Sequence, residues 1–240
     1  MIKKILAGVI SISMVVAMTG CGSSAAKTDN AGTTGQTAAQ VEFKGNDGSD
    51  TKTLVAYFSY FDNTDGENIT SKQYADAMAS ASVTVVDGKR RGNNDIVADI
   101  LKDQTGADVF SIITSEQYSP DYDGGIVEKA QEDGRNKVKP ALASHLSNLS
   151  QYDTVILLFP TWWYDMPMAV YSFLEEYDFS GKTIAPIATS GGSGLVDTVD
   201  SIKKLEPNAT VTDGLAIAQE AVVNSGADIE AWLSKVGIGK

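Results

Sequence analysis

The stretch Val155–Gly194, VILLFPTWWYDMPMAVYSFLEEYDFSGKTIAPIATSGGSG, alternates apolar runs with loops of unusual composition. Thr154–Phe159 and Thr183–Ala188 are apolar runs of strand length, and Pro167–Tyr177 between them has its apolar residues at helical spacing. The stretch therefore predicts a strand, an aromatic loop, a helix, a second strand and a Gly/Ser loop.

The two loops offer different binding groups. Pro160–Tyr164 (PTWWY) supplies flat aromatic rings, whereas Thr189–Gly194 (TSGGSG) supplies hydroxyls and accessible backbone N–H groups. In an open parallel sheet, ligands bind outside the carboxyl ends of the strands, so we expect both loops to line one pocket. Rings on one wall and N–H donors on another suit a planar heteroaromatic ligand with polar edges, and a flavin is such a ligand.

Strands and helices alternate along the rest of the chain. Further strands are expected at Leu54–Ser59, Ser82–Val86, Asp108–Ile113 and, more weakly, Val211–Ile217. Further helices are expected near Lys72–Met78 and at Asn93–Gln104, Ile126–Leu149, Leu195–Leu205 and Ala227–Val236. Asn93 or Asn94 is a natural N-cap, and Pro140 is expected to start or kink a helix. This alternation predicts an α/β domain with a parallel sheet covered by helices on both faces.

The beginning of the chain differs in composition from the rest. Met1–Gly20 has two lysines and then an apolar run, as in a secretory signal peptide. The only cysteine, Cys21, follows at the cleavage position, and the site resembles bacterial lipoprotein lipoboxes. The alternative is an uncleaved transmembrane anchor, for which the run is short, because spanning needs about 20 residues. We expect a signal peptide over 1–20, lipid modification of Cys21, a flexible tether over 21–52 and one domain over 53–240.

The formal net charge of −12 restricts the possible partners. Nucleic-acid binding normally needs a basic stripe, and anionic lipid surfaces attract basic segments. We therefore expect no nucleic-acid partner and contact with the membrane only through a lipid anchor. The acidic surface fits simple solubility or recognition of a basic redox partner.

Several short pieces occur together in a specific order. They are LVAYFS (Leu54–Ser59), Gly92-Asn93-Asn94, Tyr152-Asp153-Thr154 leading into VILLFPTWW, FSGK (Phe179–Lys182) and ATSGGSG (Ala188–Gly194). With these pieces, residues 53–236 resemble the flavodoxin-like family, in particular its bacterial FMN-binding branch with a Trp-Trp loop. The resemblance implies a doubly wound five-stranded parallel sheet of order 2-1-3-4-5 with FMN at its carboxyl edge.

The resemblance also assigns roles by position. Ser59, Asn93 and Asn94 would hold the FMN phosphate, which a helix N-terminus favours; the family usually has threonine where Asn94 stands. Pro160, Thr161, Trp162 and Trp163 would line the flavin ring, and the backbone of Ser190, Gly191, Gly192 and Ser193 would approach its polar edge. Two further contacts are expected from position in the chain alone: Tyr164 belongs to the same aromatic loop, and Tyr60 lies at the root of the segment that follows the first strand. Each position also has a structural alternative: a strand end for Ser59, a helix cap for Asn93, core packing for the tryptophans and a plain turn for the Gly/Ser loop.

Residues 60–92 form an insertion after the first strand, and we expect it to cover or flank the flavin. His145, the only histidine, is expected to be a solvated surface residue. The leading functional hypothesis is electron transfer outside the cytoplasm, with FMN as cofactor and an unknown protein or quinone as redox partner. The alternatives are an FMN-dependent NAD(P)H:quinone oxidoreductase and a surface binding module that lacks the flavin.

Overall fold

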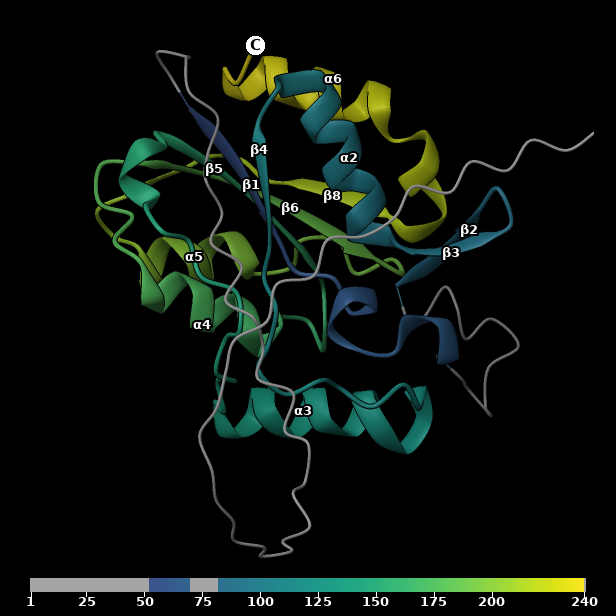
Figure 1. Ribbon diagram of the computed structural model, residues 1–240. Coiled ribbons are helices and arrows are strands. Elements are labelled where there is room, and N and C mark those ends of the chain that lie inside the picture. Colours follow the sequence, from purple (N-terminus) through teal and green to yellow (C-terminus); the bar gives the residue numbers. More distant parts are fainter. Residues whose placement is uncertain (1–51, 70–81, 240) are drawn as a thin grey trace, which may run out of the picture. The chain divides into compact units, whose positions relative to one another are not determined.

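The computed structural model in Figure 1 describes residues 52–69 and 82–239. The expected signal peptide, Cys21, the tether and the short helix near Lys72–Met78 lie outside these residues. Within the described ranges, no helix combines the length and apolarity that crossing a membrane requires.

The main sheet is parallel throughout, with the strand order β4-β1-β5-β6-β7, and β8 also pairs with β6. Its strands are β1 (Thr53–Tyr57), β4 (Asp108–Ser111), β5 (Thr154–Pro160), β6 (Thr183–Ser190), β7 (Thr210–Val211) and β8 (Leu215–Ala218). Counted along the chain, with β7 and β8 as two halves of the fifth strand, this is the expected order 2-1-3-4-5. The long apolar runs form the central strands because both faces of a parallel sheet are buried.

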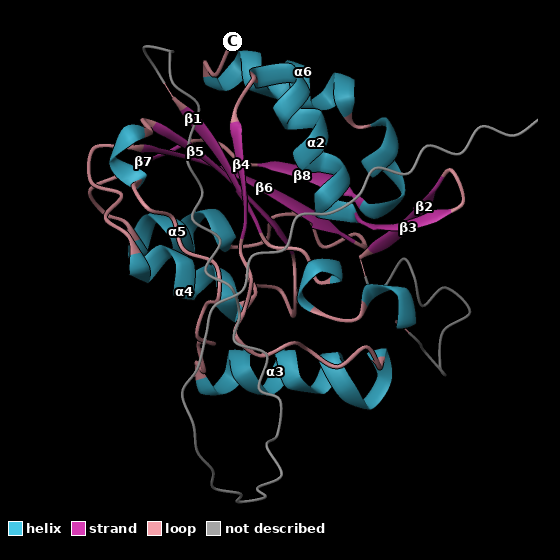
Figure 2. Cartoon of the chain, in the orientation of Figure 1, coloured by secondary structure: helices cyan, strands magenta, loops and turns pink. Residues whose placement is uncertain are grey.

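Helices cover both faces of the sheet, as Figure 2 shows. The helices are α2 (Asn93–Thr105), α3 (Val127–Asn136), α4 (Met168–Glu176), α5 (Thr198–Leu205) and α6 (Gly226–Val236). Helices α2 and α6 pack on one face through side chains such as Val97 and Trp232. Helices α4 and α5 pack on the other through Phe173 and Ile202. Successive residues of β5 serve the two cores alternately, with Leu157 in one and Leu158 in the other.

The insertion between β1 and α2 adds a small structure of its own. It contains the short turns η1 (Phe61–Asn63) and η2 (Gly66–Asn68) and an antiparallel hairpin of β2 (Val83–Val86) and β3 (Lys89–Gly92). The hairpin turns at Asp87-Gly88, where both residues have positive φ values of 50° and 76°. Side chains of the insertion form a third apolar cluster with η3 (Tyr122–Ile126) and α3. Because the insertion leaves from the carboxyl end of β1, this contact places α3 near the carboxyl ends of the strands (Figure 1).

The expected helix over Ile126–Leu149 is wrong for its second half. Helix α3 ends at Asn136, and its C-cap Lys137 has a left-handed backbone (φ 55°). The chain then runs extended beside the end of β4, where Ser115 N–H donates to Ala141 O at 2.8 Å and Ala143 N–H donates to Ile113 O at 2.7 Å. Pro140 follows Lys139 and disfavours helix there, so it neither starts nor kinks one.

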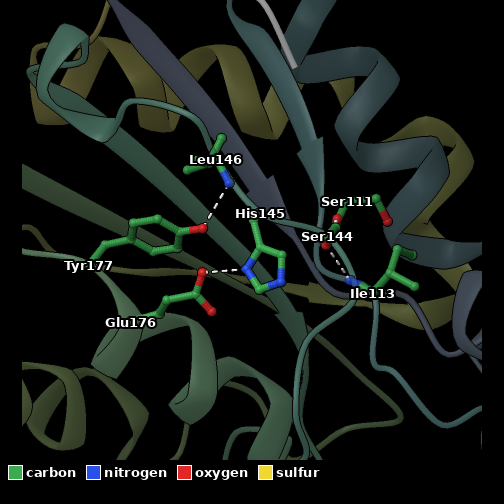
Figure 3. Close-up of polar contacts among 7 residues, drawn as sticks. All are labelled: Ser111, Ile113, Ser144, His145, Leu146, Glu176 and Tyr177. Atoms are coloured by element: carbon green, nitrogen blue, oxygen red, sulfur yellow. Dashed lines mark hydrogen bonds and ion pairs between the residues drawn. The ribbon is translucent and has the colours of Figure 1, made fainter. Parts of the chain in front are cut away.

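Side chains hold this extended segment between β4 and α4 (Figure 3). The Ser144 hydroxyl donates to Ser111 O and accepts from Ile113 N–H, both at 2.8 Å. His145 Nδ1 lies 2.6 Å from Glu176 Oε1, so this histidine is paired rather than simply solvated. The short turn η4 (Leu149–Gln151) then leads into β5.

Candidate functional site

A cavity of about 170 Å³ opens where the carboxyl ends of β1, β5 and β6 meet the insertion and α3. It brings together seven of the residues selected from the sequence: Tyr60, Asn93, Thr161, Trp162, Trp163, Ser190 and Gly191. It is also lined by Ser82, Tyr122, Ile126, Val127, Ala130, Thr189 and Gln219. Three loops that are far apart in sequence thus share one cavity at the edge where ligands of such sheets bind.

Six selected residues lie beside this cavity without lining it. Ser59 and Asn94 are buried beneath its α2 end, Pro160 is buried at the end of β5, and Tyr164, Gly192 and Ser193 are exposed. The Asn94 side chain ties the loops together, since its Nδ2 donates to Phe58 O at 2.7 Å and its Oδ1 accepts from Thr189 Oγ1 at 2.8 Å. Asn94 therefore fixes the spacing of β1, α2 and β6.

Trp162 forms the inner aromatic wall. Its ring meets those of Phe58, Tyr60 and Tyr118 edge to face, with centroid distances of 5.3, 6.2 and 5.8 Å. Phe58 and Tyr60 lie directly after β1, so this wall joins the β5 loop to the root of the insertion. Such perpendicular contacts hold the indole in one orientation.

Trp163 and Tyr164 occupy the centre of a tight turn. Trp162 and Asp165 exchange two backbone hydrogen bonds of 2.9 Å, and the two residues between them have positive φ values of 49° and 65°. That is the geometry of a type I′ turn, which normally takes asparagine and glycine. Two aromatic residues in it carry backbone strain, and strain of this kind concentrates at functional sites. Trp163 is 49 % exposed, and its Nε1 donates to Val127 O at 3.0 Å.

The Gly/Ser loop is shaped by its own first serine. Ser190 Oγ accepts from Gly194 N–H at 2.8 Å and from Gly192 N–H at 3.3 Å. Gly192 has φ 125°, a conformation open almost only to glycine. Thr161 Oγ1 donates to Gly194 O at 2.7 Å, which ties this loop to the aromatic loop.

The residue before α2, Gly92, lies very close to Ser59, which follows β1. Gly92, not Asn93 or Asn94, is the N-cap. A Cβ on Gly92 would lie 2.3 Å from Ser59 Oγ, so only glycine fits. Ser59 Oγ is buried at this point, next to the Asp95 carboxylate. Gly92 N–H donates to Asp95 Oδ2 at 3.0 Å and Asn93 N–H donates to Ser82 O at 2.8 Å. The N–H groups of the next helical residues have no partner within the helix.

Two carboxylates lie beneath this helix end. Asp62 Oδ2 accepts from Tyr57 OH at 2.9 Å and from Ser111 Oγ at 2.8 Å. Burial, and secondarily the nearby charge of Asp62, raises the pKa of Asp95 from its ordinary 3.8 to about 7. The same two causes raise the pKa of Tyr57, which therefore stays protonated and donates to Asp62.

Several lining residues escaped the sequence reading. Tyr122, Val127 and Ala130 come from η3 and α3, whose position depends on packing against the insertion, and no local signal places them. Gln219 could have been found, because it directly follows β8 and so lies at the ligand edge of the sheet.

The fold and this site define a doubly wound α/β domain with an aromatic ligand cavity at the carboxyl edge of its sheet. Comparison with known sequences identifies the family: residues 82–236, more than half of the chain, match the sequence model of the Flavodoxin family. The protein therefore belongs to the flavodoxin family. No curated protein sequence matches it significantly.

Solved structures are similar to the chain as well. A candidate flavoprotein from Bacteroides eggerthii DSM 20697 is 24 % identical, with a TM-score of 0.57 over 79 % of this chain and 99 % of that one. One from Bacteroides uniformis ATCC 8492 is 25 % identical, with a TM-score of 0.49 over 73 % and 97 %. A flavoprotein from Lactobacillus acidophilus NCFM, solved in complex with FMN, is 16 % identical, with a TM-score of 0.48 over 74 % and 99 %. Of these three, the Bacteroides eggerthii structure supports the fold described above, because its TM-score is above 0.5.

Proposed function

We propose that this protein binds FMN in the cavity between Trp162 and Gly191 and transfers electrons outside the cytoplasm. The observation that carries the proposal is the meeting of three loops, from Tyr60, Thr161–Trp163 and Ser190-Gly191, around one cavity at the carboxyl edge of the sheet. When bound, FMN supplies the redox chemistry. The protein's residues supply position and electrostatics.

The residues present fit both ends of FMN. Ser59 Oγ is buried beside the N-terminus of α2, and free N–H groups at a helix N-terminus favour a phosphate. Trp162 and Trp163 line the cavity and would contact the ring. Gly191, which has no side chain, also lines the cavity, and its backbone would reach the ring's polar edge.

The size of the cavity implies a movement on binding. Its volume of about 170 Å³ is smaller than the roughly 300–1,000 Å³ typical of small-molecule pockets. Trp163 is half exposed and forms one hydrogen bond to α3, so it is the wall most easily displaced. We expect this indole to swing outward as the ring enters.

The visible absorption spectrum of the purified protein tests the proposal. The spectrum is recorded before and after incubation with FMN and gel filtration, and a flavin band should elute with the protein. A protein that stays colourless would instead be a binding module on the same scaffold. Adding NADPH without a partner protein then separates two redox roles: rapid bleaching indicates an NAD(P)H:quinone oxidoreductase, and a persistent band indicates an electron carrier.

A further inference from the structure

A second, larger cavity of about 350 Å³ lies next to the first, and Trp162, Trp163 and Ala130 line both. Its volume is within the range of small-molecule pockets. It is bounded by α3 on one side and by the chain from the Trp-Trp turn into α4 on the other. A molecule in it would therefore stand across the tryptophan pair from the proposed flavin.

The acidic groups of this second cavity already have partners. Asp133 forms an ion pair with Lys129 one helical turn away. Asp165 accepts from Tyr171 OH at 2.9 and 3.0 Å and from Met166 N–H at 2.8 Å. The charge of Asp133 is thus matched by a cation, whereas the Asp165 carboxylate is held by neutral hydrogen-bond donors.

The basic groups are not matched in this way. Arg135 donates to the neutral amide of Gln131, and Lys137 Nζ lies 5.9 Å from the ring centroid of Tyr171. Neither cation forms an ion pair within residues 52–69 and 82–239. Both residues are exposed to solvent and line the cavity. Guanidinium groups bind carboxylate, sulfonate and phosphate through paired hydrogen bonds.

The remaining walls are apolar. Trp162 and Trp163 offer rings, and Met166 and Met168 offer polarisable thioethers that adapt to flat ligands. The cavity thus joins a surface for an aromatic ring to a pair of cations, and the two requirements select ligands that carry both an aromatic ring and an anionic group.

We propose that this second cavity binds a small planar aromatic anion, as the co-substrate class of the redox site. The assignment of that class rests on the proposed FMN function, whereas binding of the anion can be measured without it. Trp162 lines both cavities and is held by three aromatic rings, so each ligand would contact this indole from its own side.

Isothermal titration calorimetry with two matched, redox-inert probes tests this proposal. Naphthalene-2-sulfonate carries the anionic group, and naphthalene-2-sulfonamide is its neutral counterpart. The full chain should bind the sulfonate at least tenfold more tightly than the sulfonamide. The double variant R135Q/K137Q should bind both equally, whereas K203Q/K204Q on α5, which removes the same charge away from the cavity, should keep the preference.

The outcomes separate this proposal from the proposed function. Equal binding of the two probes by the unmodified protein, or a preference that survives in R135Q/K137Q, overturns the anion site whether or not FMN binds. FMN affinity is measured on the same variants by flavin fluorescence. If R135Q/K137Q loses FMN as well, the cations hold the FMN phosphate and the second site is overturned. If the protein binds the sulfonate but never FMN, the anion site stands and the redox function fails.

Discussion

The two adjacent tryptophans differ in what surrounds them. Trp162 is enclosed by three aromatic rings and supports the wall between β5 and the insertion. Trp163 projects from a strained turn and is half exposed. A structural role therefore falls mainly on the first and a ligand role mainly on the second.

Replacing each tryptophan by alanine should separate these roles. Trp163→Ala should weaken FMN binding on the order of tenfold to hundredfold, because one aromatic stacking contact contributes about 1–3 kcal/mol. It should change the free energy of unfolding little. Trp162→Ala should lower that free energy by about 3 kcal/mol. Fluorescence titration and urea unfolding measure the two effects. Tyr164→Ala is the control, since Tyr164 is 72 % exposed and outside the cavity, and a loss of FMN in it would contradict this assignment.

The surrounding atoms leave no room for a side chain at position 92. Gly92→Ala would place a Cβ 2.3 Å from Ser59 Oγ and 2.4 Å from Asp95 Oδ2, so the end of β1 and the start of α2 must separate. We expect a loss of about 1–3 kcal/mol in the free energy of unfolding, measured with urea. Gly134→Ala in α3 meets nothing within 4 Å and should be neutral or slightly stabilising. Equal effects of the two substitutions would refute the close approach.

Asp95 should make stability depend on pH. Its pKa is about 7 in the folded protein against an ordinary 3.8, so between about pH 4 and 7 the folded state keeps a proton that the unfolded state releases. The free energy of unfolding should therefore fall as the pH rises through this window. Asp95→Asn keeps an acceptor for Gly92 N–H and should flatten the dependence, leaving the variant the more stable form at pH 8.

Urea unfolding at several pH values measures this effect. Asp99→Asn, on the exposed side of the same helix, removes only a surface ion pair with Arg91 and should leave the slope unchanged. A slope that persists in Asp95→Asn would assign the dependence to another group.

At the scale of elements, the sequence predicted most reliably the strands that are buried on both faces. The apolar runs became β1, β5 and β6 nearly as expected, because two-sided burial demands such runs. The second half of Ile126–Leu149 was wrong because its conformation depends on hydrogen bonds to Ile113 and Ser115, far away in sequence. The fifth strand is broken into β7 and β8, and Val211–Ile217 gave no sign of the break.

The site was predictable to the extent that it sits at strand ends. Tyr60, Trp162 and Ser190 could be found because they follow buried strands at one edge of the sheet. The cavity residues from α3, Val127 and Ala130, could not be predicted. Their position depends on the cluster of Tyr60, Ile69, Val83 and Ile126, which assembles only in the folded chain.

This cluster couples the insertion to the ligand cavity, to which Tyr60 and Ser82 both contribute. FMN should therefore slow amide hydrogen exchange in β2, β3 and the turns after β1, since ligand binding reduces local opening. Mass spectrometry with and without FMN measures the exchange. Helix α5, on the far core, provides the internal reference, and equal slowing there would indicate a global effect instead of a covered site.

At the scale of the whole molecule, the N-terminal sequence and the acid-rich domain fit an exported, lipid-anchored protein that meets its partners in solution. We propose this location from the sequence. If it is correct, the mature protein begins at Cys21 and carries a thioether-linked lipid. Cys21→Ser should then leave the precursor uncleaved, which intact-mass spectrometry of the membrane fraction would detect. A wild-type mass without lipid would exclude the anchor.

The near contact of Ser59 and Gly92 has a consequence for how the chain can vary. The chain leaves the main sheet after Ser59 and comes back beside it at Gly92, so the two ends of the insertion nearly touch. Closing such a loop costs only about 0.6 kcal/mol for each doubling of its length. The hairpin end of this segment at Asp87-Gly88 can therefore change in length at small cost, and such a change would alter what reaches the cavity. Its first residues cannot change in the same way, because Asp62 and Asn63 hydrogen-bond to β4 and the chain after it and Tyr60 lines the cavity.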